Sequence, residues 1–522
     1  MVYHYIFSQR VLCNLIYFGF RFSLYLHFTI FPVAGFLQGT MSSAATTNAS
    51  EKAVLILRKK LGADKVILPD DTLPNLGQFG TTFYFIAQAA QIVPACRVLP
   101  VNAADVAAIL NIVRETGATF AVKSGGHNSY ASGTNAENGI TIDLSRLKDI
   151  TISDDRKSVT VGAGCRFGEI YEKLEAHGLA CVGGRISSVG VSGLTMGGGV
   201  SFFSSERGLA CDNVISYELV LANGQILNVT EKSHPDLFWG MRGAGITLGI
   251  VTRMELRTFN FGQIWGGVSV FAHENKAAVF DAINKFVHDG SDPSTEAFLL
   301  ATDAAKDGNG MYAVITSHSN PQSDTAVFND IKSLTPLTSS TQIRSLKNLC
   351  DEMESQNEPG FRFRASSLSV KCHLPTLKQV DNIHKESVAL LKDCDGFVPS
   401  ILYQPLLGSM LSRDKIGNAL GIKPEDTPLI TILWRWTDIQ HDQIIIDVAN
   451  QFVEKVAKAA RAQGTFHHYQ YLNYADSRQD IYGSYGEENR KRLLEIKAKY
   501  DPEDLMSTLR PGIIQLSGSQ KA

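Results

Sequence analysis

Two glycine-rich segments, far apart in the 522-residue chain, constrain its fold more than any other feature. The first is Ser124-Gly-Gly-His-Asn128, which directly follows a predicted strand over Thr119–Lys123. The second runs from Ile186 to Gly199 and alternates hydroxyl side chains with glycines. So many glycines carry an entropic cost, which close approach of the backbone to a large ligand explains better than an ordinary turn. Successive N–H groups in such bends suit a pyrophosphate, so the two segments predict a dinucleotide site.

The spacing of other glycines argues against the usual nicotinamide-dinucleotide motif. Gly162–Gly168 and Gly243–Gly249 both read G-x-G-x-x-x-G, which has one residue too many. Gly243 also lacks a strand immediately before it and an acidic residue about 20 positions later. The sequence therefore predicts a dinucleotide held by loops of a different kind.

Strands and helices alternate along the first half of the chain, which is typical of an α/β region. Asn102 is the predicted N-cap of a helix that ends at Gly117, and Asn223-Gly224 predicts a hairpin turn. Over residues 264–463, strand-like runs alternate with longer helices and glycine becomes rarer, which predicts a second, α+β domain. The predicted helices include Glu51–Leu61, Phe167–His177, Lys276–Val287, Ile444–Gln463 and Glu487–Lys499.

The composition is that of a globular protein, with 44% hydrophobic and 19% charged residues. The net charge is −3 and no basic tract is present, so we expect no nucleic-acid partner. The eight cysteines include no C-x-x-C pair and no zinc-like cluster. Buried thiols are therefore expected, with one or two disulfides left open. Glycosylation sequons at Asn48 and Asn228 do not decide the compartment.

The first 40 residues differ from the rest of the chain. From Val11 to Phe36 they are apolar and rich in Phe and Tyr, interrupted by Arg21 and His27. Three interpretations are open: a signal peptide, a membrane anchor, or a non-native segment before a translation start at Met41. The first two would make the protein secreted or membrane-tethered, and the third would make it cytoplasmic.

Several motifs together resemble one known family. The chain resembles the FAD-binding module of the vanillyl-alcohol oxidase / p-cresol methylhydroxylase (PCMH) superfamily at Lys123–His127, Ser188–Gly199 and Gly208–Val214. It resembles the C-terminal motif of the berberine-bridge enzymes at Tyr471–Tyr474, Glu488–Leu493 and Lys497–Pro502. The motifs occur in the order that the family uses, and fungal berberine-bridge-like oxidoreductases of secondary metabolism are the most similar in kind.

The resemblance implies an α+β protein with two main parts. One is an α/β FAD-binding domain of PCMH type, and the other is an α+β substrate domain whose antiparallel sheet is flanked by helices. The implied boundaries are an extension at 1–40, the FAD-binding domain at 41–262 with its core at about 91–259, the substrate domain at 263–465, and a C-terminal segment at 466–515 that completes the flavin site.

The resemblance implies FAD as the cofactor and assigns its contacts by position. His127 matches the histidine that bonds covalently to the 8α-methyl group of FAD. Ile186 stands where many relatives carry a second, cysteinyl link, so a single covalent bond is implied. Val189 matches the residue that controls oxygen access, and a compact valine there resembles the oxidases. The other implied cofactor contacts are Ser124, Gly125, Gly126, Asn128, Ser188, Gly190, Gly193, Gly198, Val251 and Asn473.

Two tyrosines in the tail are the implied catalytic residues. Tyr474 matches the general base of some relatives, and Tyr471 is expected to share a strand face with Asn473, beside the flavin ring. A phenol is protonated near pH 7, so a neighbouring cation or the reduced flavin must assist if it acts as a base. The alternative is that either tyrosine packs with its hydroxyl group satisfied.

The implied activity is that of an oxidase, in which FAD accepts hydride from a small organic substrate and O2 reoxidises it to give H2O2. One alternative is a dehydrogenase that uses another electron acceptor. The other is a flavin-carrying binding protein without turnover. The substrate and the oligomeric state stay open, and a membrane becomes a partner only if the N-terminal segment is retained.

The predicted second domain offers further candidates. The acidic base that some relatives carry on its sheet has no clear match, since Gln404 is neutral. Trp434 and Trp436 alternate with Arg435 and would form either an aromatic floor for a substrate or ordinary sheet packing. His467-His468 lacks an identifiable third ligand, so we expect no metal site.

Overall fold

The computed structural model describes residues 40–71, 83–289, 292–302, 310–322, 325–425 and 429–518. The apolar N-terminal segment, with its three interpretations, lies outside these ranges. Within them, no helix is both long and apolar enough to cross a membrane. Residues Ala45–Ala522 form one compact unit.

A four-stranded sheet forms the first layer of this unit. Its strand order is β1-β2-β4-β3, in which β2, β4 and β3 run parallel and β1 is antiparallel. The strands are β1 Val66–Ile67, β2 Cys96–Val98, β3 Phe120–Lys123 and β4 Ile140–Asp143. Asn102 accepts a hydrogen bond from the Asp105 N–H at 2.8 Å and caps helix α4 (Ala103–Thr116), which ends at Gly117 with φ 73°. The predicted cap and end of this helix are confirmed.

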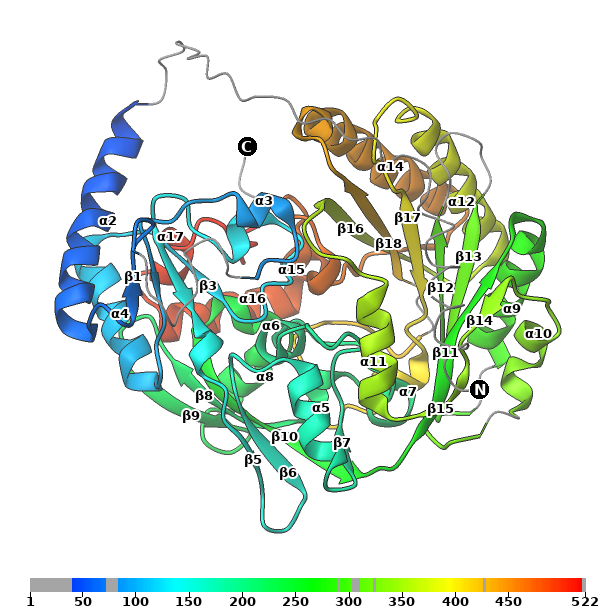
Figure 1. Ribbon diagram of the computed structural model, residues 1–522, viewed down its shortest axis with the longest axis horizontal. Helices are drawn as coiled ribbons and strands as arrows, with labels where there is room; N and C mark the ends of the chain where they lie inside the picture. The colour runs from blue at the N-terminus through cyan, green and yellow to red at the C-terminus, as the bar shows by residue number, and fades with distance from the viewer. Residues whose placement is uncertain are drawn as a thin grey trace, which may run out of the picture. The chain divides into compact units, whose positions relative to one another are not determined.

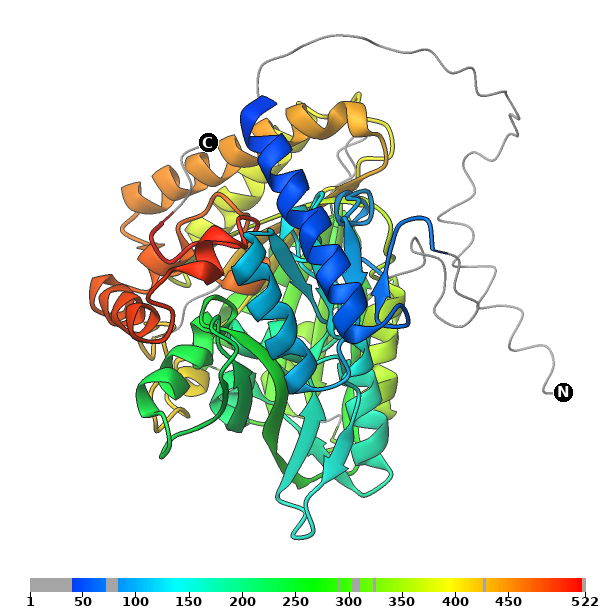
Figure 2. The same cartoon turned by 90° about the vertical axis from the view of Figure 1, so that its left-hand side faces the viewer.

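Helix α2 (Thr40–Leu61) runs beside α4, as Figures 1 and 2 show. Its buried Ala53 and Leu57 join the same core as Val106 and Ile109 of α4. The helix begins well before the predicted start at Glu51. The prediction relied on apolar spacing, and the small and hydroxyl residues before Glu51 lack that spacing, although they continue the helix.

A second sheet follows, with the order β5-β6-β10-β8-β9 and with β7 paired to β10, all antiparallel. Its strands are β5 Ile150–Ile152, β6 Ser158–Gly162, β7 Leu179–Cys181, β8 Val214–Val220, β9 Ile226–Thr230 and β10 Ile250–Asn260. The helices along this part are α5 Phe167–Glu175, α6 Val191–Met196, α7 Ser204–Arg207 and α8 Pro235–Ala244. Gly224, with φ 82°, occupies the β8–β9 turn, so the predicted hairpin is confirmed.

The third sheet has nine strands in the order β14-β11-β13-β12-β17-β18-β16-β19, with β15 paired to β11. Its strands are β11 Ile264–Phe271, β12 Thr295–Thr302, β13 Met311–His318, β14 Thr338–Ser339, β15 Gln342–Arg344, β16 Arg362–Val370, β17 Ser400–Gln404, β18 Leu429–Trp436 and β19 Phe466–His467. All pairings are antiparallel. Figure 1 shows helices α9 (Lys276–Asp289), α12 (Leu374–Ala389) and α14 (Asp442–Ala462) along its outer face. The antiparallel sheet flanked by helices is the predicted α+β architecture.

The two tryptophans of β18 face these outer helices. Trp434 donates from Nε1 to His384 Nε2 of α12 at 3.0 Å, and Trp436 donates to Asp442 Oδ1 of α14 at 2.7 Å. Both rings are fully buried. The interpretation as sheet packing is therefore confirmed, and the aromatic floor for a substrate is wrong.

The C-terminal segment returns from the third sheet to the first. It comprises the 3-10 turn η9 Leu472–Tyr474 and helices α15 Ile481–Ser484, α16 Glu487–Tyr500 and α17 Leu505–Thr508. The Phe120 N–H of β3 donates to the Leu509 carbonyl at 2.7 Å, and the Tyr485 hydroxyl donates to the Gly243 carbonyl at 3.0 Å.

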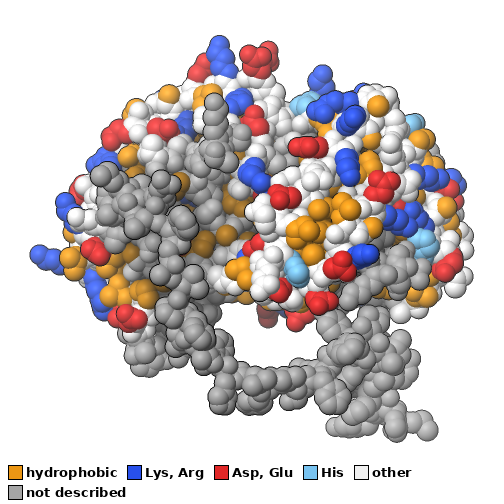
Figure 3. Space-filling model, turned by 90° about the horizontal axis from the view of Figure 1, so that it is seen from above, with side chains coloured by type: hydrophobic (Ala, Val, Ile, Leu, Met, Phe, Trp, Pro, Cys, Tyr) orange, Lys and Arg blue, Asp and Glu red, His pale blue; other side chains and the backbone are white. Residues whose placement is uncertain are grey.

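Acidic and basic side chains are interspersed on the face shown in Figure 3.

Candidate active site

The two glycine loops meet backbone to backbone. A Cβ atom added to Gly125 would lie 2.3 Å from the Gly190 nitrogen, and one added to Gly190 would lie 2.5 Å from the Gly125 nitrogen. Real Cβ atoms do not approach so closely, so both positions require glycine for this contact. Gly190 is also the residue from which helix α6 begins. The structure thus brings the two predicted loops into one place, at the end of strand β3.

Hydroxyl side chains fasten the loops to the second sheet. Ser124 and Ser192 both donate to the Ala163 carbonyl, at 2.6 and 2.9 Å. The Ala163 N–H donates to the Thr252 carbonyl at 2.9 Å, next to Val251. Val251 itself is buried in strand β10. The serines in the glycine-rich segments therefore hold the backbone of both loops in place.

Gly193 faces open space in the structure. It is exposed, although Ser192 and Thr195 on the same short helix are buried. An added Cβ atom would meet no atom within 4 Å. Gly198 differs, because a Cβ atom added there would lie 3.3 Å from the Leu420 side chain and 3.4 Å from the Tyr471 ring. Packing and a φ of 110° explain glycine at position 198 without a ligand.

His127 is held on both sides of its ring. Its Nε2 lies 2.8 Å from the Ser188 hydroxyl oxygen, and its ring stacks on Phe85 with 4.9 Å between centroids. Burial and the nearby Arg166 lower the pKa of His127 to about 3. The imidazole is therefore neutral at physiological pH, the form in which it is a nucleophile.

The aromatic support of His127 was not predictable from the glycine motif. Phe85 belongs to a segment that precedes helix α3 (Ala87–Ala90), and its N–H donates to the Gly126 carbonyl at 2.9 Å. Gln88 of α3 exchanges hydrogen bonds with the backbone of Phe363 on β16, at 3.1 Å each. The segment thus links the histidine loop to the third sheet.

Three further predicted contacts lie beside the histidine. Asn128 Oδ1 accepts from the Tyr130 N–H at 3.2 Å, and Ser188 is buried against His127. Val189 is partly buried, and its carbonyl accepts from the Phe167 N–H at 3.0 Å. These residues belong to the two glycine loops, and their contact with FAD stays a prediction.

The Tyr471 hydroxyl oxygen is buried among hydrogen-bond donors. It accepts from the N–H groups of Gly199 and Val200, at 3.1 and 3.2 Å, and from Asn473 Nδ2 at 3.0 Å. Burial raises the pKa of Tyr471 well above its usual value. The expected strand over this motif is wrong, because residues 472–474 form the 3-10 turn η9. Asn473 Nδ2 also donates to the Leu194 carbonyl at 2.9 Å, so both side chains fasten the tail to the second glycine loop.

Tyr474 instead faces a cation from another part of the chain. Arg185 donates from Nη2 to the Tyr474 hydroxyl oxygen at 3.1 Å and from Nη1 to Gln404 Oε1. Its guanidinium lies 4.2 Å from the centre of the Phe298 ring. Both Arg185 and Tyr474 remain partly exposed. A tyrosine that acts as a base requires a cation of this kind, and no local motif around Arg185 indicated the contact.

A buried carboxyl group lies near the same arginine. Glu296 of β12 is 4% exposed and accepts from the Ser205 N–H at 2.7 Å. Burial raises the pKa of Glu296 to about 7, although the Ser205 bonds and the charge of Arg185 act in the opposite direction. Its alternation along β12 with Phe298 places both side chains on the face toward Arg185. No sequence motif pointed to this residue.

The raised pKa of Glu296 predicts that the free energy of unfolding depends on pH. The folded protein holds this proton up to about pH 7, whereas the unfolded chain loses it near pH 4.5. Stability should therefore fall as pH rises through this window. The Glu296→Gln variant keeps an acceptor for Ser205 and lacks the decline, so it should be more stable than the parent at pH 8 by roughly 3 kcal/mol. Denaturant unfolding at pH 5 and pH 8 checks this, and parallel profiles for the two proteins would contradict it.

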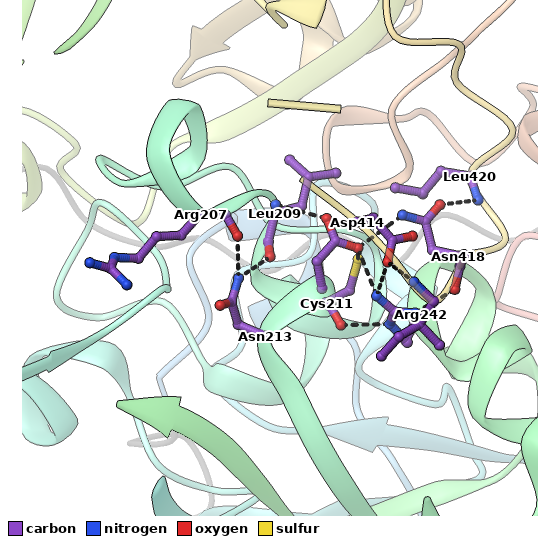
Figure 4. A network of polar contacts seen from close by, with 11 residues as sticks. Arg207, Leu209, Cys211, Asn213, Arg242, Asp414, Asn418 and Leu420 are labelled. Atoms are coloured by element: carbon purple, nitrogen blue, oxygen red, sulfur yellow. Dashed lines mark hydrogen bonds and ion pairs between the residues drawn. The ribbon is translucent and has the colours of Figure 1, made fainter. Parts of the chain in front are cut away.

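A buried network fastens the Gly208–Val214 motif to the loop that precedes β18 (Figure 4). Arg242 is fully buried and pairs with Asp212 at 3.1 Å and Asp414 at 2.7 Å. It also donates to the carbonyls of Cys211 and Gly417. On that loop, Leu420 packs against Gly198 and Gly243. Through Leu420, the network therefore supports Gly198 of the second glycine loop.

Removing the cation of this network should be costly. The Arg242→Met variant would leave two carboxylates buried without compensation, and we expect it to lose about 3–5 kcal/mol of stability. Arg461→Met is the matched control, because Arg461 is exposed and stacks on Phe466 at 4.1 Å. Denaturant unfolding should separate the two variants. A loss below about 1 kcal/mol for Arg242→Met would contradict the network's role.

The cysteines and histidines form no metal site among the residues that the structure describes. His467 and His468 stack at 4.6 Å, and His467 Nε2 lies 3.4 Å from Glu425 Oε1. The buried free thiols are Cys96, Cys165, Cys181, Cys211, Cys350 and Cys394. For these six cysteines, the prediction of buried thiols is confirmed.

Comparison with known proteins gives the family. Residues 94–230 match the FAD binding domain family, and residues 470–507 match the family described as berberine and berberine like. The FAD-dependent monooxygenase tpcD of Cochliobolus heterostrophus is 33% identical, over 84% of this chain and 88% of its own length. The FAD-dependent monooxygenase drtC of Aspergillus calidoustus is 29% identical, over 88% and 89%.

Solved structures show the same fold at low identity. Xylooligosaccharide oxidase from Myceliophthora thermophila superposes with a TM-score of 0.73 at 20% identity, covering 90% of this chain and 100% of its own. A variant of berberine bridge enzyme superposes with a TM-score of 0.70 at 17% identity, covering 87% and 98%. Together with the paired glycine loops and the tail that closes on them, these matches show that the chain belongs to the berberine-bridge-enzyme-like FAD-dependent oxidoreductases of the vanillyl-alcohol oxidase / PCMH superfamily.

Proposed function

We propose that this protein is an oxidase that removes hydride from a small organic substrate and uses O2 as the electron acceptor, giving H2O2. FAD, when bound, supplies the redox chemistry. The FAD-binding part would span residues 41–262, the substrate part 263–465 and the closing tail 466–515. The observation that carries the proposal is the contact between Arg185 and Tyr474, because it places a cation on a tyrosine beside the glycine loops.

Tyr474 takes the proton of a substrate O–H or N–H group in this proposal. Arg185 donates to the Tyr474 oxygen at 3.1 Å and stabilises the negative charge that a basic phenol oxygen must carry. Tyr471 is the weaker choice, since it is buried, its burial raises its pKa, and no charged group donates to its oxygen among the hydrogen bonds of the described residues. Among the two tyrosines implied by the family resemblance, Tyr474 is therefore our choice of base.

His127 is the proposed covalent tether of FAD. Its imidazole is neutral, and the Phe85 ring stacks on it. Because Nε2 is hydrogen-bonded to Ser188, Nδ1 is the ring nitrogen left for the covalent bond. Ile186 replaces the cysteine of doubly linked relatives, so we propose a single bond. Val189, which is partly buried beside these groups, is the proposed controller of oxygen access.

A monooxygenase is the second candidate, because the curated relatives are named FAD-dependent monooxygenases. Reaction under 18O2 separates the candidates. An oxidase releases one H2O2 per substrate oxidised and leaves no 18O in the product, whereas a monooxygenase incorporates one 18O atom. A third outcome, slow reoxidation of the flavin by air in stopped-flow mixing, would indicate a dehydrogenase and contradict the proposal.

A further inference from the structure

Arg185, in the loop between β7 and α6, differs in its partners from the buried arginines of β16 in the third sheet. Arg362 pairs with Asp442, and Arg364 pairs with Asp476. Among the described residues, Arg185 has only neutral hydrogen-bond partners, the Gln404 amide oxygen and the Tyr474 hydroxyl. A guanidinium prefers a planar pair of anionic oxygens. Its charge is therefore not matched by a directly bonded carboxylate.

The surroundings of Arg185 suit an anionic ligand. Phe298 supports one face of the guanidinium, at 4.2 Å, and fixes its plane. Arg185 and Tyr474 both keep exposed surface. Glu296, the carboxyl group whose pKa responds to Arg185, is bonded to the Ser205 N–H on another element. The arginine thus presents donors that a ligand can reach.

We propose that Arg185 and the Tyr474 hydroxyl form the binding site for a substrate oxyanion on an sp2 carbon, which is either a carboxylate that the substrate already carries or the phenolate or enolate left when Tyr474 takes the substrate's proton. Arg185 would give up its bond to Gln404 and donate to the oxyanion, while Tyr474 stays beside the reacting group. This inference rests on the proposed function, because that function places the substrate at Tyr474. It goes further by naming the class of substrate.

The test titrates the FAD-loaded protein with benzoate, 4-nitrophenolate and neutral benzamide and follows the flavin absorbance. Arg185→Met should raise the Kd of the anion that binds by about 10–100-fold and leave that of benzamide within about 3-fold. Arg185→Lys should recover part of the loss. Arg461→Met, the same change at an exposed arginine stacked on Phe466, should leave every Kd unchanged.

The arms of the experiment separate the possible results. Benzoate alone binding through Arg185 indicates a carboxylate substrate, and 4-nitrophenolate alone indicates a phenol or enol. Equal effects of Arg185→Met on benzoate and benzamide, or no spectral response to either anion, would overturn the inference. Failure of the proposed function would give a different result. A protein that binds the anions through Arg185 but produces no H2O2 with any substrate would support the anion site and contradict the oxidase proposal.

Discussion

Replacing Tyr474 by phenylalanine should lower the rate of anaerobic flavin reduction by about 100- to 10,000-fold, because the general base is lost. The Arg185 donor at 3.1 Å would then face a ring edge, while the packing of the aromatic ring is kept. Stopped-flow reduction with the first substrate that a metabolite screen identifies is the measurement. Melting temperature and flavin content should stay close to the parent values.

The matched comparison is Tyr471→Phe. That change leaves the buried N–H groups of Gly199 and Val200 without their acceptor, so it should cost about 1–3 kcal/mol of stability. Its flavin reduction rate, once FAD is bound, should fall far less than that of Tyr474→Phe. If Tyr474→Phe reduces flavin as fast as the parent, Tyr474 is not the base.

Replacing Gly125 by alanine should abolish stable FAD binding. The new Cβ atom would lie 2.3 Å from the Gly190 nitrogen, so the two loops must separate. Overpacking of this kind costs about 1–3 kcal/mol or more, and here it acts where the loops meet. The purified variant should be colourless or nearly so, as its absorbance spectrum will show.

Gly193→Ala is the informative partner of that variant. Its Cβ atom would meet no protein atom within 4 Å, so the fold should be undisturbed. The methyl group would instead enter the open space that we assign to FAD. Flavin content should drop while the apoprotein keeps its melting temperature. A Gly193→Ala protein with full flavin content would move the cofactor away from helix α6.

The sequence allowed the glycine loops, the helix cap at Asn102 and the Asn223-Gly224 hairpin to be predicted. Each depends on a few neighbouring residues whose backbone requirements are local. The tail motif was recognised, but its conformation was not. Alternation favoured a strand there, whereas the segment forms a 3-10 turn in which the Tyr471 hydroxyl oxygen accepts hydrogen bonds from the second glycine loop.

The residues that complete the site could not be predicted in this way. Arg185 and Tyr474 meet only because the tail returns across the molecule after the third sheet, and neither carries a sign of the other. Phe85 reaches His127 through backbone pairing with Gly126. Glu296 acquires its raised pKa from burial that only the assembled layers provide. Such contacts are set by tertiary packing and leave no local pattern.

The most direct test of this account is the mass of the peptide that contains His127, taken from denatured protein that has been purified with its cofactor. We expect yellow protein, with FAD attached to that peptide and to no cysteine-containing peptide. FAD released intact on denaturation would contradict the tether at His127. Protein that stays colourless after incubation with FAD would contradict the whole assignment of the paired glycine loops.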